Sequence, residues 1–109
     1  MSNWSEFKTY TDLSLIFILN SIVGVYLITS GGKVIYVGKA DYSLKNRLSD
    51  HLKFSTESNK VLVNYLMAGG CRFSLLEVPQ KIDRDRIEKE LIQLYSPVCN
   101  KQNNPFPVR

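Results

Sequence analysis

Two tyrosines with chemically useful hydroxyls flank a glycine pair in this chain. Tyr26 ends the motif Gly-Val-Tyr, and Tyr36 begins the motif Tyr-Val-Gly. The Gly31-Gly32 pair between the two short apolar runs is typical of a β-hairpin. On paired strands the two phenols can converge on one point and act there on a ligand. Tyrosine is also a favoured strand residue, so simple alternation would explain both side chains.

A carboxylate falls inside the apolar face of the last predicted helix, over residues 83–95. Successive residues of a helix lie about 100° apart. This spacing places Glu88 among five apolar residues: Ile87, Leu91, Ile92, Leu94 and Tyr95. An acid that faces the core is costly unless a cation, hydrogen bonds or a metal ion compensates its charge. A core ion pair, a position at the edge of the face and a functional role all fit this pattern.

Arg47 and His51 are four residues apart and therefore share a face of the helix predicted over residues 43–54. The guanidinium of Arg47 offers a fork of donors to a phosphate. His51 can donate to the same group or shuttle a proton. The alternative for Arg47 is a surface ion pair with Asp50 or Asp41.

Further polar residues are candidates for ligand contact. Lys39 follows Gly38, where a glycine lets the backbone approach a ligand closely. Asn100, after Pro97, is placed to hydrogen-bond back to a strand. Other basic side chains are candidates for phosphate contacts, although most surface lysines are simply solvated: Lys8, Lys45, Lys53, Lys60, Arg84 and Arg86.

The apolar periodicity predicts an α/β (α+β) fold with a small three-stranded antiparallel or mixed sheet flanked by helices. Strands are expected at residues 22–29, 33–37 and 71–78. Helices are expected at residues 43–54 after the cap Asp41, at 57–67, and at 83–95 with the cap Asp83. A first helix from Thr11-Asp12 to Asn20 is expected to turn four side chains inward: Leu13, Ile16, Phe17 and Leu19.

Composition narrows the class of protein. The 109 residues suffice for one domain, and the net charge of +4 is compatible with a nucleic-acid partner. Cys71, Cys99 and the single histidine cannot build a zinc site, and the lone cysteines favour a reducing compartment. The apolar stretch at residues 13–19 is too short for a membrane helix and lacks signal-peptide flanks. We therefore expect a cytoplasmic protein without a membrane partner.

Together these residues resemble the GIY-YIG nuclease family. The match runs through Gly24-Val25-Tyr26, Tyr36-Val37-Gly38-Lys39-Ala40, the Arg47 helix with His51, and Glu88-Lys89-Glu90-Leu91-Ile92, and it ends at Pro97 and Asn100. The motif around Tyr36 is most similar to the N-terminal incision domain of the bacterial excision-repair nuclease. The position of His51 is more similar to restriction and homing members. The resemblance implies an N-terminal helical extension (1–20), a catalytic domain (21–100) and a C-terminal tail (101–109).

The resemblance also implies a metal-dependent DNA endonuclease that hydrolyses a phosphodiester bond and nicks one strand at each site. Glu88 would hold Mg²⁺ (or Mn²⁺), and Arg47 would stabilise charge on the phosphate. Tyr26 would be the general base, its pKa lowered by Lys39 and Arg47. The remaining residues would assist: Tyr36 and His51 by orienting the water and Tyr26, and Asn100 by bracing the site.

The expected partners are DNA and a second DNA-binding domain or subunit, and the protein would be nucleoid-associated when bound to DNA. Two other classes stay open. One is a module of GIY-YIG-like fold that binds DNA or a protein without cutting. The other is a basic interaction domain with no nucleic-acid role, in which Glu88, Arg47 and both tyrosines serve packing alone.

Overall fold

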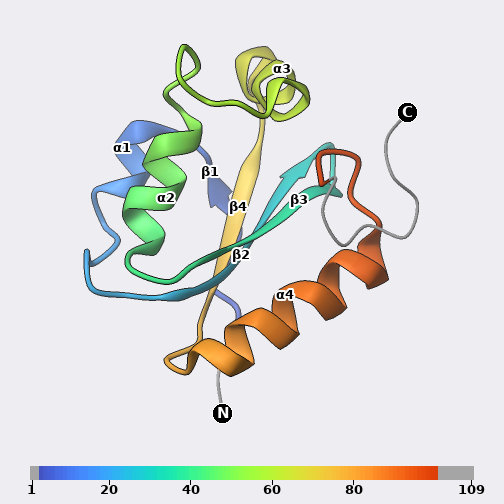
Figure 1. The fold of residues 1–109 in the computed structure, drawn as a ribbon. Helices are drawn as coiled ribbons and strands as arrows, with labels where there is room; N and C mark the ends of the chain where they lie inside the picture. Colours follow the sequence, from blue (N-terminus) through green and yellow to red (C-terminus); the bar gives the residue numbers. More distant parts are fainter. Residues whose placement is uncertain (1–2, 101–109) are drawn as a thin grey trace.

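Four antiparallel strands form one sheet in the order β1-β4-β2-β3 (Figure 1). The computed structural model describes residues 3–100, so the predicted tail 101–109 lies outside the described residues. The strands are β1 (Lys8–Thr9), β2 (Gly24–Ser30), β3 (Lys33–Ala40) and β4 (Arg72–Glu77). The helices are α1 (Asp12–Leu15), α2 (Leu44–His51), α3 (Lys60–Ala68) and α4 (Lys81–Tyr95).

The α/β class is confirmed, whereas the predicted number of three strands is wrong. The additional strand, β1, has two residues and pairs with β4 through Lys8 opposite Phe73 and Thr9 opposite Arg72. Two residues are too few to show a periodicity of two, which is why the sequence pattern does not reveal this strand.

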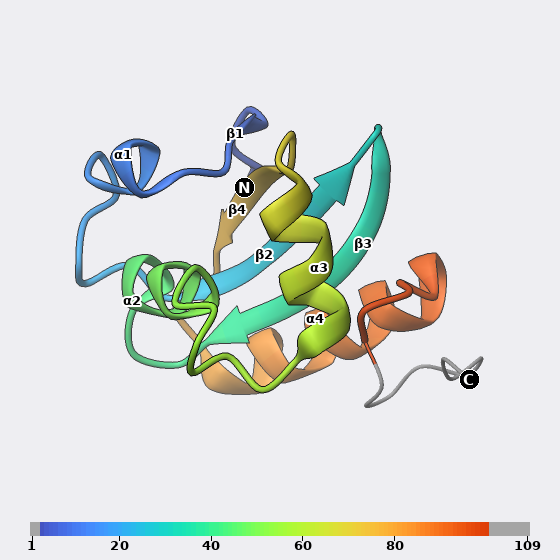
Figure 2. The same ribbon diagram turned by 90° about the horizontal axis from the view of Figure 1, so that it is seen from above.

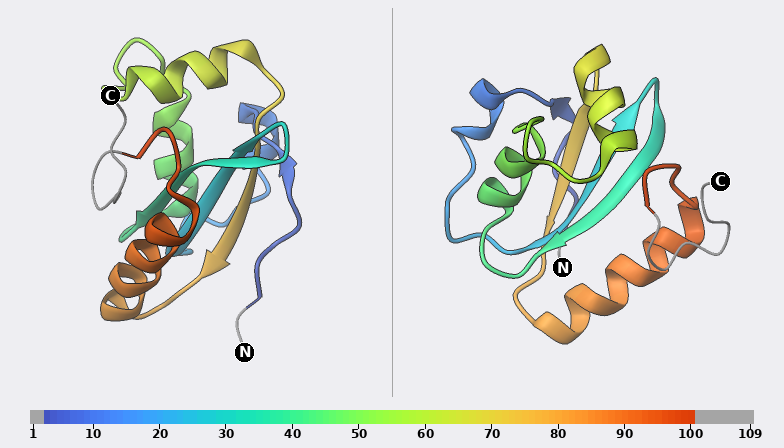
Figure 3. Two further views of the ribbon diagram at one scale, coloured as in Figure 1. Left: turned by 90° about the vertical axis from the view of Figure 1, so that its right-hand side faces the viewer. Right: turned by 45° about the horizontal axis from the view of Figure 1, so that its top comes forward.

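Helices cover both faces of the sheet. Figure 1 shows α2 and α3 above the sheet and α4 below it; in Figure 2, seen from above, α2 and α3 lie in front of the sheet and α4 behind it, and Figure 3 gives the same layers from two further sides. The alternation along β2 follows this division. Tyr26 and Ile28 belong to the core with α2 and α3, whereas Val25 and Leu27 belong to the core with α4. Because β3 is an edge strand, residues from both layers can meet along it.

The hairpin of β2 and β3 places both tyrosines on one face. Tyr26 pairs with Gly38 and Ile28 pairs with Tyr36, so the two phenols are diagonal neighbours. The turn at Gly31-Gly32 has φ values of 59° and 78°, which glycine adopts without strain. The hairpin predicted from this glycine pair is therefore confirmed.

The first helix differs most from the prediction. It ends at Leu15, so the helical wheel does not apply to the residues beyond it. Four side chains expected to face inward are instead between 57% and 81% exposed: Leu13, Ile16, Phe17 and Leu19. Leu15 is buried in their place. Thr11 caps the helix as expected, in a reciprocal pair of hydrogen bonds with Ser14.

Two predicted caps are also wrong. Ser43, not Asp41, caps α2, because its hydroxyl accepts a hydrogen bond from the backbone N–H of Asn46. The last helix begins at Lys81, so Asp83 lies in its first turn. There its negative charge interacts favourably with the positive end of the helix dipole. Asn59 caps α3, which leaves Glu57 outside that helix.

No helix among residues 3–100 has the length and apolar character needed to span a bilayer.

We predict that Gly38→Ala destabilises the protein by about 1–3 kcal/mol. A Cβ at this position would lie 2.3 Å from the ring of Tyr26, far inside van der Waals contact. Urea denaturation measures the loss. The double variant with Tyr26→Leu removes the ring and should lose less than the sum of the two single variants. Strict additivity would contradict this account.

Candidate active site

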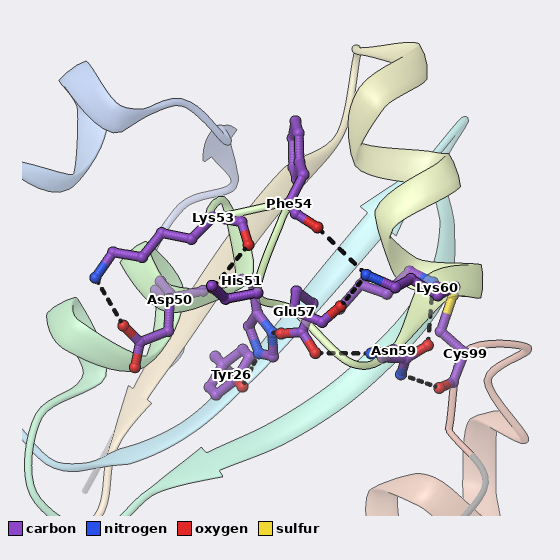
Figure 4. Close-up of polar contacts among 12 residues, drawn as sticks. Tyr26, Asp50, His51, Lys53, Phe54, Glu57, Asn59, Lys60 and Cys99 are labelled. Atoms are coloured by element: carbon purple, nitrogen blue, oxygen red, sulfur yellow. Dashed lines mark hydrogen bonds and ion pairs between the residues drawn. The ribbon is translucent and has the colours of Figure 1, made fainter.

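A chain of two short hydrogen bonds runs from β2 to the loop before α3 (Figure 4). The fully buried hydroxyl of Tyr26 lies 2.6 Å from Nε2 of His51. Nδ1 of the same ring lies 2.6 Å from Oε1 of Glu57. The other carboxylate oxygen of Glu57 accepts a hydrogen bond of 2.9 Å from the backbone N–H of Asn59.

The pKa directions assign the protons in this chain. Burial lowers the pKa of His51 against the opposing effect of Glu57, so the ring is neutral. Burial alone would raise the pKa of Glu57, but hydrogen bonds from Asn59 and His51 reverse this effect and keep the carboxylate ionised. An ionised Glu57 can only accept a hydrogen bond, so Nδ1 of His51 carries the ring proton and donates a hydrogen bond to Glu57. Nε2 is therefore the acceptor for the hydroxyl of Tyr26.

Tyr36 lies beside this chain and nearer the surface. Its ring centroid is 6.1 Å from that of Tyr26 and 5.3 Å from that of His51. Burial raises the pKa of Tyr36, and Arg47 and a side-chain hydrogen bond with Tyr26 oppose that rise. Tyr36 is partly exposed, whereas Tyr26 is fully buried. The two phenols therefore form an outer and an inner hydroxyl.

The expectation that Lys39 and Arg47 bring the pKa of Tyr26 below its ordinary value is wrong. Burial raises this pKa well above its ordinary value, and the lowering by Arg47 is too small to reverse it. Lys39 is held elsewhere, in ion pairs with Asp85 and with Asp41, the latter at 3.5 Å.

Arg47 is exposed on α2 and forms neither of the ion pairs that the sequence left open. Asp41 pairs with Arg84 at 3.0 Å, and Asp50 pairs with Lys53 at 3.2 Å. Arg47 instead lines two open depressions with volumes of about 290 and 510 Å³. Its guanidinium is thus placed to receive an anion from solvent.

Arg84 is a structural residue, which excludes it from the candidate phosphate contacts. Its side chain is 5% exposed. Besides the ion pair with Asp41, it donates to the backbone carbonyls of Val78 and Pro79 at 3.0 and 2.8 Å. This side chain occupies the buried face of α4, where the sequence placed Leu94 and Tyr95. Those two residues are 71% and 44% exposed.

Glu88 is partly buried on α4, as the helical wheel indicated. Its carboxylate has no hydrogen bond or ion pair with any residue between 3 and 100. Burial raises its pKa, and Lys39 and Arg47 lower it. Its negative charge in turn raises the pKa values of Tyr26 and Tyr36. Glu88 therefore lies in the same electrostatic neighbourhood as the two phenols.

This carboxylate fits a magnesium ion that keeps most of its water. Within the described residues, Glu88 belongs to no group of three or more His, Cys, Asp or Glu side chains suited to holding a metal. Mg²⁺ binds through one or two carboxylates and retains several waters, so a single unpaired acid matches its requirements.

Asn100 braces β3 beside Tyr36. Its side chain accepts a hydrogen bond from the backbone N–H of Val37 and donates one to the carbonyl of the same residue, both at 2.8 Å. The contact with a strand predicted from the sequence is thereby confirmed. Nearby, the side chain of Asn59 donates to the carbonyl of Cys99 at 2.8 Å.

The structure thus brings Tyr26, Tyr36 and His51 together and places Arg47 and Glu88 around them. Lys39 lines the smaller of the two depressions together with Arg47. Sequence reasoning missed Glu57, which was assigned to a helix. An acid six residues after a histidine gives no periodic signal, because the intervening turn determines where it points.

Comparison with known families gives a match over most of the chain. The family model of the UvrC-like GIY-YIG domain matches residues 22–101. The chain belongs to this family.

A curated relative supports the assignment to the GIY-YIG family. This chain is 40% identical over 87 residues to the UvrABC system protein C of Fusobacterium nucleatum. That alignment covers 77% of this chain but 14% of the relative, so the chain spans a small part of that protein's length.

The GIY-YIG fold is also seen in solved structures. The N-terminal endonuclease domain of UvrC from Thermotoga maritima, bound to magnesium, superposes with a TM-score of 0.65 at 24% identity. This superposition covers 81% of this chain and 92% of that domain. A tyrosine-to-phenylalanine variant of the same domain, bound to its divalent cation, gives the same TM-score. At this identity the likeness concerns the fold.

We predict that the free energy of unfolding decreases as the pH falls below about 6.5. Burial keeps the folded pKa of His51 below its ordinary value of 6.5. The unfolded chain then binds a proton that the folded chain excludes, so acid favours unfolding. Urea denaturation at a series of pH values measures this slope.

In the variant His51→Gln, the free energy of unfolding should depend less on pH over the same interval. Glu57 acts in the same direction only below its ordinary pKa of 4.5, and Glu88 acts in the opposite direction. Glu88 is present in both proteins, and Glu57 contributes only below its ordinary pKa, so well above pH 4.5 the difference between the two curves reports His51. Identical slopes would contradict the assignment of a neutral, buried imidazole.

Proposed function

We propose that this chain is the catalytic domain of a metal-dependent DNA endonuclease that hydrolyses a phosphodiester bond and nicks one strand. The observation that carries the proposal is the partly buried carboxylate of Glu88, which has no hydrogen bond or ion pair among residues 3–100 and whose charge acts on the phenols of Tyr26 and Tyr36. Packing alone gives no reason to keep such an acid there, because partial burial of a carboxylate without a hydrogen bond or ion pair is unfavourable.

Glu88 would hold Mg²⁺ or Mn²⁺. Such an ion, when bound, neutralises charge on the phosphate and stabilises the leaving oxygen. Arg47 would donate to the non-bridging phosphate oxygens, where negative charge grows in the transition state. The two open depressions that Arg47 lines leave room for the backbone on either side of the scissile phosphate.

The proton of the attacking water would leave through the hydroxyl chain. Tyr26 is fully buried, so we place the water at the outer hydroxyl, Tyr36. The water gives a proton to Tyr36, Tyr36 passes its own to Tyr26, and Tyr26 passes its own to Nε2 of His51. The water oxygen bonds to phosphorus as the bond from phosphorus to the 3′ oxygen breaks. The 3′ oxygen takes a proton from solvent, and His51 later returns one to solvent.

This relay is compatible with the raised pKa values that burial gives both tyrosines. A phenolate does not have to accumulate if each hydroxyl gains a proton as it loses one. In this proposal Tyr26 is an intermediate carrier and His51 the final proton acceptor, so the relay replaces the role of general base that the sequence analysis expected for Tyr26.

The relative from F. nucleatum belongs to the UvrABC system, and we propose that this chain likewise makes an incision in DNA. Because the chain spans a small part of that relative, further DNA-binding domains or subunits would direct it to its substrate. The two free cysteines, Cys71 and Cys99, suit a cytoplasmic enzyme that meets the chromosome.

We predict that Glu88→Gln lowers cleavage by more than about 100-fold and leaves DNA binding intact. The change removes the metal-binding charge and keeps the volume. Cutting of circular plasmid with Mg²⁺, with and without a chelator, measures activity, and a gel-shift assay measures binding. The melting temperature should stay the same or rise, because burial disfavours this charge.

Glu90→Gln is the matched control for Glu88. Glu90 is exposed on the same helix and pairs with Arg86 at 3.2 Å, so this variant should cut as the wild type does. Undiminished cutting by Glu88→Gln, or cutting by the wild type in chelator, would exclude the metal role.

We predict that Arg47→Ala lowers turnover by about 100-fold or more, as loss of a transition-state donor does elsewhere. Arg86→Ala removes an exposed arginine of α4 that already has two acidic partners, and it should change turnover little. Single-turnover cleavage at saturating DNA compares the two. Equal rates would return Arg47 to the class of solvated surface residues.

A further inference from the structure

Glu57 is the buried end of the hydrogen-bond chain that starts at Tyr26, and no comparison assigns it a role. It lies in the loop between α2 and α3, six residues after His51. Its side chain is 9% exposed, and both of its oxygens have donors: Nδ1 of His51 at 2.6 Å and the backbone N–H of Asn59 at 2.9 Å. Figure 4 shows the carboxylate between the imidazole and Asn59.

We propose that Glu57 is a positioning residue for the nuclease reaction: it holds His51 with the proton on Nδ1, so that the lone pair of Nε2 faces the hydroxyl of Tyr26. This inference rests on the proposed function, because it names the group that makes the His51 end of the relay effective. In this role Glu57 acts through His51 and not on the reacting atoms.

The two hydrogen bonds of His51, taken with the ionised state of Glu57 and the neutral state of the ring, assign the protons. An ionised carboxylate can only accept, so the nitrogen facing Glu57 must donate. A neutral imidazole has one donor and one acceptor, so Nε2 is left to accept. An acid that orients a histidine in this way also stabilises the imidazolium once the histidine has taken a proton.

The loop fixes Glu57 from its other side. Asn59 donates its backbone N–H to the carboxylate, and its side chain accepts from the backbone N–H of Leu62 at 3.1 Å to cap α3. The same side chain donates to the carbonyl of Cys99. Glu57 is therefore held from this side by the residue that caps a helix.

The charges around His51 come from several elements. Arg47 and Asp50 lie on its own helix, Tyr26 and Tyr36 face it from β2 and β3, and Glu57 faces it from the loop. The strongest opposing effects are burial, which favours the neutral ring, and Glu57, which favours the protonated ring.

The test compares Glu57→Gln with the wild type over a pH series. A glutamine can accept from His51 or from Asn59 with its single oxygen, but it cannot stabilise an imidazolium. We expect kcat to fall by about 10- to 100-fold, as for other residues that orient a catalytic group. The acid limb of kcat/KM should move to lower pH, because loss of the carboxylate makes His51 harder to protonate.

Two variants separate positioning from stability. Glu57→Asp keeps the charge, so its acid limb of kcat/KM should lie nearer to that of the wild type than the limb of Glu57→Gln does. Asn59→Ala removes the side-chain cap of α3 and leaves the backbone N–H that binds Glu57. It should lower the melting temperature without moving the acid limb. If Glu57→Gln cuts at the wild-type rate, or loses activity without a shift of the limb, the positioning role is overturned.

A second readout does not need cleavage. Nitrogen-15 NMR of the single histidine in the metal-free protein should show a protonated Nδ1 and an unprotonated Nε2, and Glu57→Gln should change this state. The reverse tautomer in the wild type would overturn the inference whatever the activity. If the wild type does not cut DNA but shows the expected tautomer, the nuclease proposal fails and the orienting contact stands.

Discussion

A tyrosine hydroxyl that is fully removed from water needs a hydrogen-bond partner inside the protein, and the structure is organised around meeting that need. A buried hydroxyl without a partner costs a few kcal/mol, so the fold must bring an acceptor to Tyr26. The acceptor comes from the last residue of α2, and its own second nitrogen is bound by Glu57. Gly38 opposite Tyr26 completes the arrangement, because its missing side chain leaves the space that the ring fills.

The edge strand β3 explains how groups from separate layers reach one region. The phenols and His51 belong to the layer of α2 and α3, whereas Glu88 comes from α4 on the other side. A central strand would keep these groups apart, since the sheet itself would separate them. Asn100 binds both backbone groups of Val37, the residue that follows Tyr36 on this strand, and so ties the segment after α4 to the edge strand.

Much of this organisation could be predicted from the sequence, because strong local signals mark it. The glycine pair specifies the hairpin, the spacing of Arg47 and His51 places both on one helix, and the wheel detects Glu88 among apolar neighbours. The prediction that four side chains of residues 13–19 face inward is wrong, because that helix ends after four residues.

Other features depend on contacts between distant segments, which periodicity cannot report. The burial of Arg84 follows from its ion pair with Asp41 and two carbonyls of a preceding loop. The raised pKa of Tyr26 depends on how completely the fold covers it, whereas the sequence shows only which cations are near. The role of Glu57 depends on the course of a turn that has no repeating pattern.

The loop between α2 and α3 carries a consequence for the lifetime of the assembled site. Glu57 and Asn59 both lie on it, so any local opening of this loop releases the imidazole from its carboxylate even while the sheet stays intact. The backbone amide of Asn59, bonded to Glu57 when the loop is closed, exchanges with solvent deuterium mainly from the open form. Its exchange rate therefore measures how often the loop opens and frees His51 from Glu57 while the rest of the protein stays folded.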